Sequence, residues 1–171
     1  MNTNTPLIIL GSARGQSDTK EFAAYVFAQT DHHLMDLLNY SISPYDYKGV
    51  YPASDQFTEL TAEMLAHDTL IFATPVYWYS MSGLMKTVFD RLTDLVTIEK
   101  ASGRKFKNKH VLLIAVGADP ELPEGFEIPF KNTAAYFEMQ YKGCVYFSTD
   151  QIELERDKSG KRKMFIEMLK G

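Results

Sequence analysis

The stretch LIILGSARGQSDTKEFAAYVF, residues 7–27, sets out the arrangement that the rest of the chain repeats. A compact apolar run from Leu7 to Leu10 ends at Gly11 and predicts a buried strand. Apolar residues then recur at the spacing of a helix, at Phe22, Ala23, Val26 and Phe27. The stretch therefore predicts a strand, a short loop and a helix in direct succession.

The same alternation continues along the chain. Further apolar runs predict strands at Leu34–Leu38, Thr69–Ala73, Val111–Val116 and Val145–Phe147, and Thr74 and Pro75 are expected to stop the run that starts at Thr69. Helical spacing recurs at Phe57, Leu60 and Met64; at Leu84, Val88, Leu92 and Leu95; at Phe130, Ala134, Phe137 and Tyr141; and, after the polar stretch Glu155 to Lys163, at Met164, Phe165, Met168 and Leu169. This alternation predicts an α/β fold in a single domain over residues 1–171: a three-layer, doubly wound sheet of five parallel strands in the order 2-1-3-4-5, with helices on both faces.

Composition and charge exclude several classes of function. The formal net charge of -4 gives no bulk attraction for nucleic acid or for an anionic membrane. No apolar run approaches the ~20 residues that span a bilayer. The polar start, residues 1–6, does not resemble a signal peptide. We therefore expect a cytoplasmic protein that binds neither nucleic acid nor a membrane.

The side chains that most often bind metals in proteins are sparse. The single cysteine, Cys144, excludes a disulfide within the chain and a multi-cysteine metal site, and we expect it in the core. His32 and His33 lack the spacing that places two histidines on one helix face. The sequence therefore predicts no metal site.

The loop after the first strand, Gly11 to Thr19, is rich in hydroxyl and small side chains and leads directly into a helix. A helix N-terminus offers unpaired N–H groups and a partial positive charge, so with these hydroxyls it suits a phosphate, and Arg14 would add a charged contact. The alternative is a strand end followed by a helix cap, because Asp18-x-x-Glu21 has the form of a capping box. The loop is neither G-x-G-x-x-G nor G-x-x-x-x-G-K-[ST], so a dinucleotide site and a nucleoside triphosphatase are unsupported.

The loop after the third strand, Thr74 to Lys86, contains three consecutive aromatic residues, Tyr77, Trp78 and Tyr79. Such a loop suits a flat ring system, which needs an apolar wall and a stacking face. The alternative is a hydrophobic loop that plugs the sheet end or forms a dimer contact. Both loops are expected at the carboxyl edge of neighbouring strands. A phosphate and a flat tricyclic ring are the two ends of FMN, which fits this pair of loops.

On these two loops the sequence resembles the NAD(P)H-dependent FMN reductase and quinone reductase family of the flavodoxin-like superfamily, in element order over nearly the whole chain. The resemblance implies that the FMN phosphate binds the first loop, at Ser12, Arg14, Gln16, Ser17 and Thr19, with Asp18, often a neutral residue in the family, among them. It implies that the isoalloxazine ring binds Pro75, Val76, Tyr77, Trp78, Tyr79, Ser80 and Met81, and a third region after the fourth strand, Gly117 and Ala118. The second motif continues to Lys86, Asp90 and Arg91, which we expect to be structural.

The resemblance also implies an activity. We expect an FMN-dependent NAD(P)H oxidoreductase that transfers hydride through flavin N5 to a small acceptor such as a quinone, an azo or nitro compound or free flavin. It implies a homodimer with FMN near the interface and no catalytic side chain, because the chemistry belongs to the cofactor. Backbone N–H groups near residues 77–80 and 117–118 would stabilise the reduced ring. The alternatives are a flavodoxin-type electron carrier, against which the modest charge argues, and a non-enzymatic interaction module.

Overall fold

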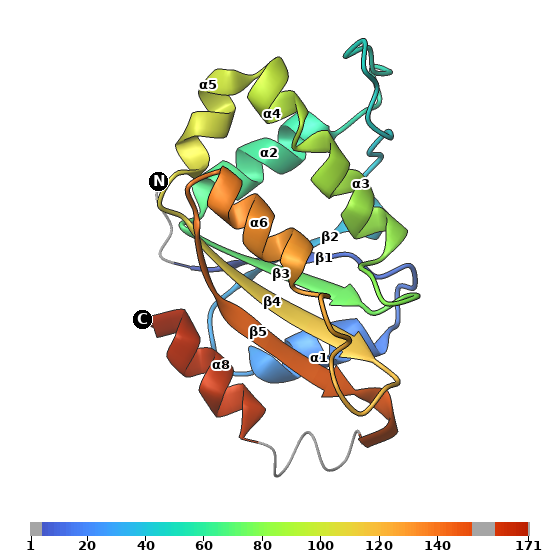
Figure 1. The fold of residues 1–171 in the computed structure, drawn as a ribbon, viewed down its shortest axis with the longest axis vertical. Helices are drawn as coiled ribbons and strands as arrows, with labels where there is room; N and C mark the ends of the chain where they lie inside the picture. Colours follow the sequence, from blue (N-terminus) through green and yellow to red (C-terminus); the bar gives the residue numbers. More distant parts are fainter. Residues whose placement is uncertain (1–4, 152–159, 171) are drawn as a thin grey trace.

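A five-stranded parallel sheet forms the centre of the protein in the computed structural model, which describes residues 5–151 and 160–170 (Figure 1). The strands are β1 (Leu7–Leu10), β2 (His33–Asp36), β3 (Thr69–Pro75), β4 (His110–Gly117) and β5 (Gln140–Ser148). They lie in the order β2-β1-β3-β4-β5, and every pairing is parallel. The predicted doubly wound sheet and its strand order are confirmed.

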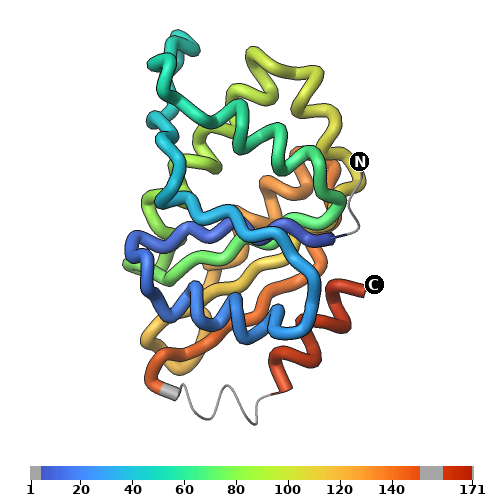
Figure 2. Tube along the Cα trace, turned by 180° about the vertical axis from the view of Figure 1, so that it is seen from behind, coloured from blue at the N-terminus to red at the C-terminus, as the bar shows by residue number. Residues whose placement is uncertain are grey.

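Helices cover both faces of this sheet, which makes three layers (Figures 1 and 2). The helices are α1 (Asp18–Val26), α2 (Phe57–Ala66), α3 (Gly83–Arg91), α4 (Asp94–Thr97), α5 (Lys100–Gly103), α6 (Ile128–Tyr136) and α8 (Lys161–Lys170), with short 3-10 turns η1 (Leu37–Asn39), η2 (Arg104–Phe106) and η3 (Thr149–Gln151). One face of the sheet carries α1 and α8, and the other carries α2 to α6. Residues 152–159 lie outside the described residues, and they include the first part of the polar stretch Glu155 to Lys163, residues 155–159.

The apolar strands alternate their side chains between two separate cores. Leu7 and Ile9 of β1 face the core beneath α2, α3 and α6, whereas Ile8 and Leu10 face the core beneath α1 and α8. All four side chains are almost fully buried. This explains why β1 has no polar alternation: a parallel strand covered on both faces must be apolar throughout.

Several strand boundaries differ from the prediction, and the largest difference is in β5, which runs over Gln140–Ser148 and not only over Val145–Phe147. The strand expected over Leu34–Leu38 ends at Asp36, because the Asp36 carboxylate accepts the N–H of Leu38 at 3.1 Å and caps η1. β3 continues through Thr74 and Pro75 instead of stopping before them, and Pro75 pairs with Val116. The backbone groups of successive residues in a strand point alternately to its two sides. The Ala73 carbonyl accepts a hydrogen bond from Gly11 on the β1 side, and the Val76 N–H donates to Val116 on the β4 side, so the nitrogen of Pro75 points to the β1 side. Because β1 has already ended there, the missing N–H of Pro75 costs no hydrogen bond of the sheet.

Two helical predictions are also corrected. The helix expected from Leu84 to Leu95 divides into α3 and α4, because Thr93 donates to Asp90 and Leu95 to Leu92 in three-residue turns. Tyr141 does not lie on the helix with Phe130 but on β5, where its hydroxyl donates to Glu127 at 2.7 Å. Helix α6 ends earlier since Glu138 adopts a left-handed conformation, with φ of 55°.

The long connection between η1 and α2 is held by a buried group of charges around Arg91, the last residue of α3. The guanidinium donates two hydrogen bonds to Asp55, at 2.8 and 3.1 Å, and one to Asp94 at 2.8 Å. Arg91 also donates to the carbonyl of Ser43 and lies 3.5 Å from the centre of the Tyr51 ring. We name Arg91, Asp55, Asp94 and Tyr51 the Arg91 cluster.

The Arg91 cluster explains the role of the last residue in the predicted ring-binding motif. Burial by itself raises the pKa of Asp55, but hydrogen bonds from Arg91 and from the N–H groups of Ser43 and Phe57 lower it from 3.8 to about 2. Lys86 and Asp90 form a separate exposed pair along α3, at 2.5 Å. The burial of Arg91 agrees with the expectation that this residue has a structural role.

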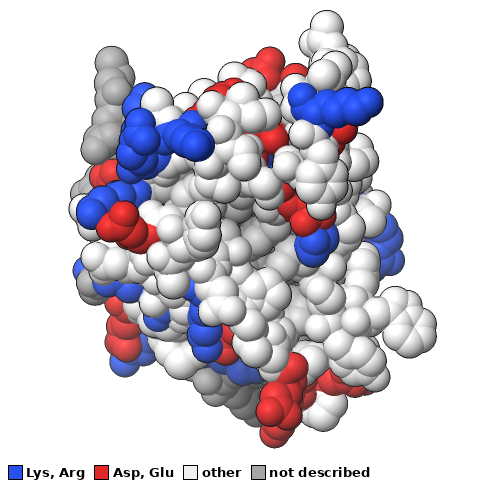
Figure 3. All heavy atoms as spheres, turned by 45° about the horizontal axis from the view of Figure 1, so that its top comes forward, with Lys and Arg blue, Asp and Glu red and all other residues white. Residues whose placement is uncertain are grey.

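The surface shows no dominant sign of charge on the face drawn in Figure 3, where basic and acidic side chains lie in interspersed groups. In the described part of the chain, no helix combines the length and apolar character needed to cross a membrane.

Candidate functional site

The loops after β1, β3 and β4 meet at one edge of the sheet and enclose a cavity of about 190 Å³. Figure 1 shows β3, β4 and β5 ending on this same side of the molecule. The cavity is lined by Ser12, Arg14, Ser17, Asp18, Thr19, Pro75, Val76, Tyr77, Val116, Gly117, Ala118 and Thr149. Doubly wound sheets bind ligands at this carboxyl edge, next to the point where the strand order reverses.

The structure brings together most of the residues predicted from the sequence. Ser12, Arg14, Ser17, Asp18 and Thr19 from the first loop line the same cavity as Pro75, Val76 and Tyr77 from the second and Gly117 and Ala118 from the third. The predicted residues outside that lining are Gln16, Trp78, Tyr79, Ser80 and Met81. The first four of these are exposed, whereas the Met81 side chain is buried in the core beneath α3.

The first loop is shaped by its hydroxyl side chains. Ser17 caps α1, since its hydroxyl accepts the N–H of Lys20 at 3.2 Å. The predicted capping box, with Asp18 as the cap and Glu21 as its partner, is therefore wrong by one residue, and Asp18 begins the helix. The N–H groups of Asp18 and Thr19 belong to the first helical turn, which has no acceptor within its own helix.

Charge in the first loop comes from one exposed pair. The guanidinium of Arg14 lies 3.6 Å from the carboxylate of Asp18, and both side chains are largely solvent-accessible. Because each is held only by a surface ion pair, either can turn toward a ligand at small cost. The buried hydroxyl of Ser12 accepts the N–H of Arg14 at 3.4 Å, so the loop backbone is fixed although the charged side chain is not.

Ser82 joins the first loop to the second. Its hydroxyl donates to the carbonyl of Gly11 and accepts the N–H of Met85 at 3.1 Å, while its own N–H donates to the Thr74 hydroxyl at 3.1 Å. A Cβ atom on Gly11 would lie 2.9 Å from Met85, which explains the glycine at this close approach. The two loops are therefore held in a fixed relation before any ligand binds.

The aromatic residues of the second loop form a tight turn. Tyr77 and Ser80 exchange two backbone hydrogen bonds, at 2.9 and 3.1 Å. Trp78 and Tyr79 occupy the turn with φ of 48° and 63°, a left-handed conformation that costs roughly 1–3 kcal/mol for each bulky residue. Their side chains are 93% and 70% exposed. Backbone strain concentrated in exposed aromatic residues indicates a functional rather than a packing role.

This turn sharpens the prediction about backbone donors. The N–H groups of Tyr77 and Ser80 are used inside the turn. Among the described residues, the N–H groups of Trp78 and Tyr79 have no backbone acceptor, so these two remain for a ligand at the turn. The expectation for residues 77–80 therefore narrows to the two residues at its tip.

The third loop, after β4, is held close to the second. A Cβ atom on Gly117 would lie 2.9 Å from the Tyr146 hydroxyl and 3.1 Å from the Val76 side chain, so a glycine is needed for the third loop to pack against these side chains. The Tyr146 hydroxyl donates to the Asp119 carbonyl at 2.6 Å, and the Ser148 hydroxyl to the Ala118 carbonyl at 3.3 Å. Thr149, which follows β5 and lines the cavity, was not predicted from the sequence, although it too follows the end of a parallel strand.

The donor set of this edge fits FMN. Hydroxyls, helix N–H groups and a guanidinium surround the cavity beside α1, which suits a phosphate. Exposed aromatic side chains lie beside the cavity on the second loop, which suits a flat ring. Because about 190 Å³ is below the roughly 300–1,000 Å³ of most ligand pockets, the cavity suits the narrow end of such a molecule, with the ring toward the surface.

The cavity lining holds no cysteine or histidine among the described residues. Cys144 lies on β5, packed against the core, and burial raises the pKa of its thiol, which keeps it protonated. The described lining therefore offers neither a thiol nor an imidazole, and the chemistry expected of a flavin site belongs to the cofactor.

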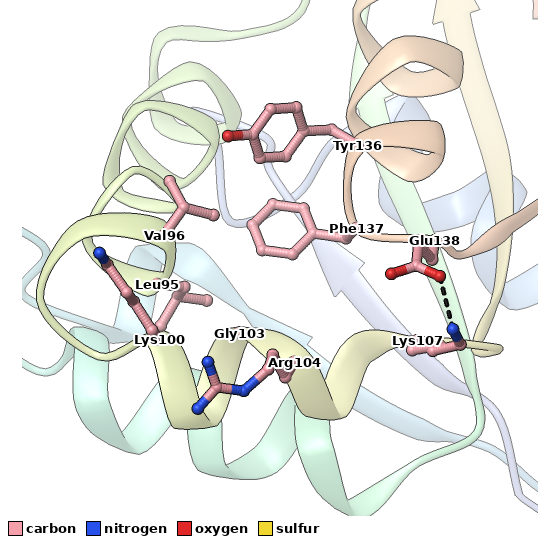
Figure 4. A pocket seen from close by; sticks show the side chains of 9 residues that line it. All are labelled: Leu95, Val96, Lys100, Gly103, Arg104, Lys107, Tyr136, Phe137 and Glu138. Atoms are coloured by element: carbon pink, nitrogen blue, oxygen red, sulfur yellow. Dashed lines mark hydrogen bonds and ion pairs between the residues drawn. The ribbon is translucent and has the colours of Figure 1, made fainter.

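A larger cavity of about 420 Å³ lies between α4, α5 and the end of α6 (Figure 4). Its walls include Leu95, Val96 and Phe137, with Lys107 and Glu138 paired at 2.6 Å on one side. Lys107 and Glu138 precede β4 and β5, so this cavity lies nearer the opposite edge of the sheet. Volume alone does not indicate a ligand site, and the smaller cavity has the strand ends and the convergent donors.

Comparison with known proteins identifies the family of the chain. The model of the family described as NADPH-dependent FMN reductase matches residues 6–153. A Bacillus subtilis protein with the provisional name NAD(P)H-dependent FMN-containing oxidoreductase YwqN is 29% identical over 149 residues, 81% of each chain. An FMN-dependent NADPH-azoreductase of Staphylococcus haemolyticus is 32% identical over 95 residues, 50% of each chain. Among solved structures, the Trp repressor binding protein of Bacillus subtilis has a TM-score of 0.73 at 23% identity, covering 93% of this chain and 99% of that one, which shows a shared fold.

Proposed function

The chain belongs to the NADPH-dependent FMN reductase family of oxidoreductases, and from that premise we propose that it binds FMN at the carboxyl-edge cavity and reduces a small aromatic acceptor with NADPH or NADH. The observation that carries this proposal is the cavity itself, to which the loops after β1, β3 and β4 all contribute. Family membership also favours an enzyme over an electron carrier or an interaction module.

We assign the phosphate end of FMN to the first loop. Ser12, Ser17 and Thr19 bring hydroxyls to the lining, and the first N–H groups of α1 add donors and a partial positive charge. Arg14 would leave Asp18 and contact the phosphate, exchanging an exposed ion pair for a stronger charge-assisted contact. Asp18 repels the phosphate and is best oriented away from it.

The ring end is assigned to the second and third loops. Tyr77 and Val76 provide an apolar wall, and Gly117 lets the third loop approach this wall closely. The turn at Trp78 and Tyr79 presents two aromatic side chains to solvent. FMN, when bound, supplies hydride acceptance from the nicotinamide and electron transfer to the acceptor, so the chain needs no catalytic side chain of its own. The protein's task is to position the ring and restrict water.

The acceptor is proposed to be a planar molecule, such as a quinone, an azo or nitro compound, or free flavin. The exposed Trp78 and Tyr79 beside the cavity leave a surface on which a flat aromatic molecule can stack. One relative carries the name azoreductase, which is consistent with this class. A direct comparison of turnover with a quinone and with an azo dye, at equal NADPH, would rank the acceptors.

We also propose that two copies associate through the face that carries this turn. Large aromatic side chains exposed together are typical of interfaces, and Trp78 and Tyr79 contribute such a surface. Sedimentation analysis of the wild type and of Trp78→Ala tests this, with a dimer expected for the wild type. A monomeric wild type that binds FMN normally would reject the dimer while leaving the cofactor proposal intact.

Titration of the cofactor-free protein with FMN tests the central proposal. Saturable binding is expected, with weaker binding of riboflavin because it lacks the phosphate. Anaerobic addition of NADPH to the complex should then bleach the yellow absorbance of the flavin promptly. Failure to bind FMN would reject the proposal, and binding without bleaching by NADPH or NADH would favour the electron carrier instead.

A further inference from the structure

His33, Glu63 and His67 converge at the edge of the sheet opposite the carboxyl-edge cavity. One nitrogen from each histidine and one oxygen of Glu63 all lie within 4.8 Å of one another. His33 begins β2, Glu63 lies on α2, and His67 follows the end of that helix. The site therefore joins two separate parts of the chain, which is why the spacing of His32 and His33 alone gave no sign of it.

His67 is oriented by a backbone carbonyl. Its ring is buried, with 1% of the side chain exposed, and Nδ1 lies 2.7 Å from the Thr5 carbonyl oxygen. Because a carbonyl oxygen only accepts, Nδ1 carries the hydrogen, and in the neutral ring Nε2 presents its lone pair to Glu63. A carbonyl on the second nitrogen is also the usual support of a histidine that binds a metal.

The facing atoms of His67 and Glu63 need a proton or a cation between them. Nε2 of His67 lies 3.4 Å from Oε1 of Glu63, and Nδ1 of His33 lies 3.8 Å from the same oxygen. A lone pair and a carboxylate at such a distance repel unless a second proton or a cation joins them. Ligands at the zinc–nitrogen and zinc–oxygen distances of a tetrahedral site lie about 3.4 Å apart, so the His67–Glu63 distance already matches.

We propose that His33, Glu63 and His67 form a binding site for a divalent transition-metal cation such as Zn²⁺, with water completing the coordination. Two imidazoles and one carboxylate are a ligand set that zinc accepts. The His33 side chain is 53% exposed, so it has room for the small movement that would bring its nitrogen into the coordination distance. The bound ion would tie the start of β2 to the end of α2 and, through His67, to the segment before β1.

Zinc titration of the full chain, stripped of metal with a chelator and free of any histidine tag, tests the proposal. One equivalent of Zn²⁺ is expected to bind saturably, and at a hundredfold excess over its dissociation constant to raise Tm by about 5–11 °C. Because FMN is proposed to bind at the opposite edge, the FMN affinity of the same preparation should not change. The outcome is therefore independent of the proposed function.

Matched variants separate this site from adventitious binding. His33→Ala and Glu63→Gln should lower zinc affinity by more than the ~10–100-fold that loss of an outer-shell partner costs. His32→Ala and Glu59→Gln, neighbours in the sequence and on the helix, should bind zinc as the wild type does. Wild-type affinity in His33→Ala and Glu63→Gln, or no saturable binding to the wild type, would overturn the proposal. His67→Gln is not needed, so a folding defect at that buried position does not affect the result.

Discussion

Arg14 and Arg91 both face aspartates, but one does so at the surface and the other in the interior. Arg14 lies 3.6 Å from Asp18 beside the carboxyl-edge cavity, with 68% of its side chain exposed. Arg91 makes bonds as short as 2.8 Å to Asp55 and Asp94, with 3% exposed. An arginine paired with aspartate therefore has a different role in each place. Arg91 stabilises the fold, whereas Arg14 remains available to bind a ligand. Burial, which the sequence does not display, separates them.

The largest expected effect is on the interior side of this comparison. Arg91→Ala leaves the carboxylates of Asp55 and Asp94 buried without their cation, and it should lower the free energy of unfolding by about 3–5 kcal/mol. Urea denaturation measures this loss. Lys86→Ala, which breaks an exposed pair on the same helix, is the control, with an expected change below about 0.5 kcal/mol. Equal small losses in both variants would show that the Arg91 cluster does not stabilise the fold.

On the surface side, Arg14→Ala should weaken FMN binding by about 1.5–3 kcal/mol, because it removes a charged donor from the phosphate. Riboflavin binding should change little, since that molecule lacks the phosphate. The stability of the FMN-free protein should stay within about 0.5 kcal/mol of the wild type. Fluorescence titration with both flavins provides the measurement, and Arg104→Ala, away from this cavity, is the control. Unchanged FMN affinity would remove Arg14 from the site.

Acid should reveal the interior cluster without a mutation. The pKa of Asp55 is about 2 in the folded protein against 3.8 ordinarily, so its folded form binds protons less readily than its unfolded form. Its contribution, about 2 kcal/mol, is therefore fully present above about pH 4 and is lost as the pH falls toward 2. Urea midpoints measured across this range should fall more steeply for the wild type than for Asp55→Asn. Parallel pH profiles would contradict the assignment.

The smallest expected effect is at Asp18. Asp18→Asn removes a negative charge beside the phosphate and frees Arg14, so FMN should bind more tightly by up to about 1 kcal/mol. The gain should shrink at high salt, because the groups are exposed. FMN titrations at two salt concentrations measure it, with Asp90→Asn on α3 as the control. Weaker FMN binding in Asp18→Asn would show that the carboxylate supports the site instead of opposing it.

Much of the fold could be predicted because the sheet is buried on both faces. An apolar run such as Leu7 to Leu10 is stable only where both of its faces are buried, which is the position of a central parallel strand. The spacing of these runs along the chain then predicts the alternation of strands and helices. The errors lie where hydrogen bonds compete with the apolar pattern. Tyr141 fits the spacing of α6, yet it lies on β5, because Glu138 ends the helix in a left-handed turn.

The site was predicted as two loops and a short third region, and these include most of the residues that line the cavity but not all of them. Met81 was included because it continues the run from Pro75, but the tight turn at Trp78 and Tyr79 redirects the chain and buries it. Thr149 was not predicted because only the loops after the first, third and fourth strands were expected to form the site. The Glu63–His67 pair was missed because its third member, His33, is distant in the sequence. Such three-dimensional neighbours require the fold.

The left-handed turn at Trp78 and Tyr79 has a consequence for protein engineering. Asparagine followed by glycine adopts this backbone readily, so replacing the two aromatics by that pair should make the protein more thermostable. Selection for heat resistance alone would thus favour loss of the residues proposed to serve the ring and its acceptor. A screen for variants of higher thermal stability must therefore also measure enzyme turnover. Without that measurement, it will select stable variants whose reaction site is impaired.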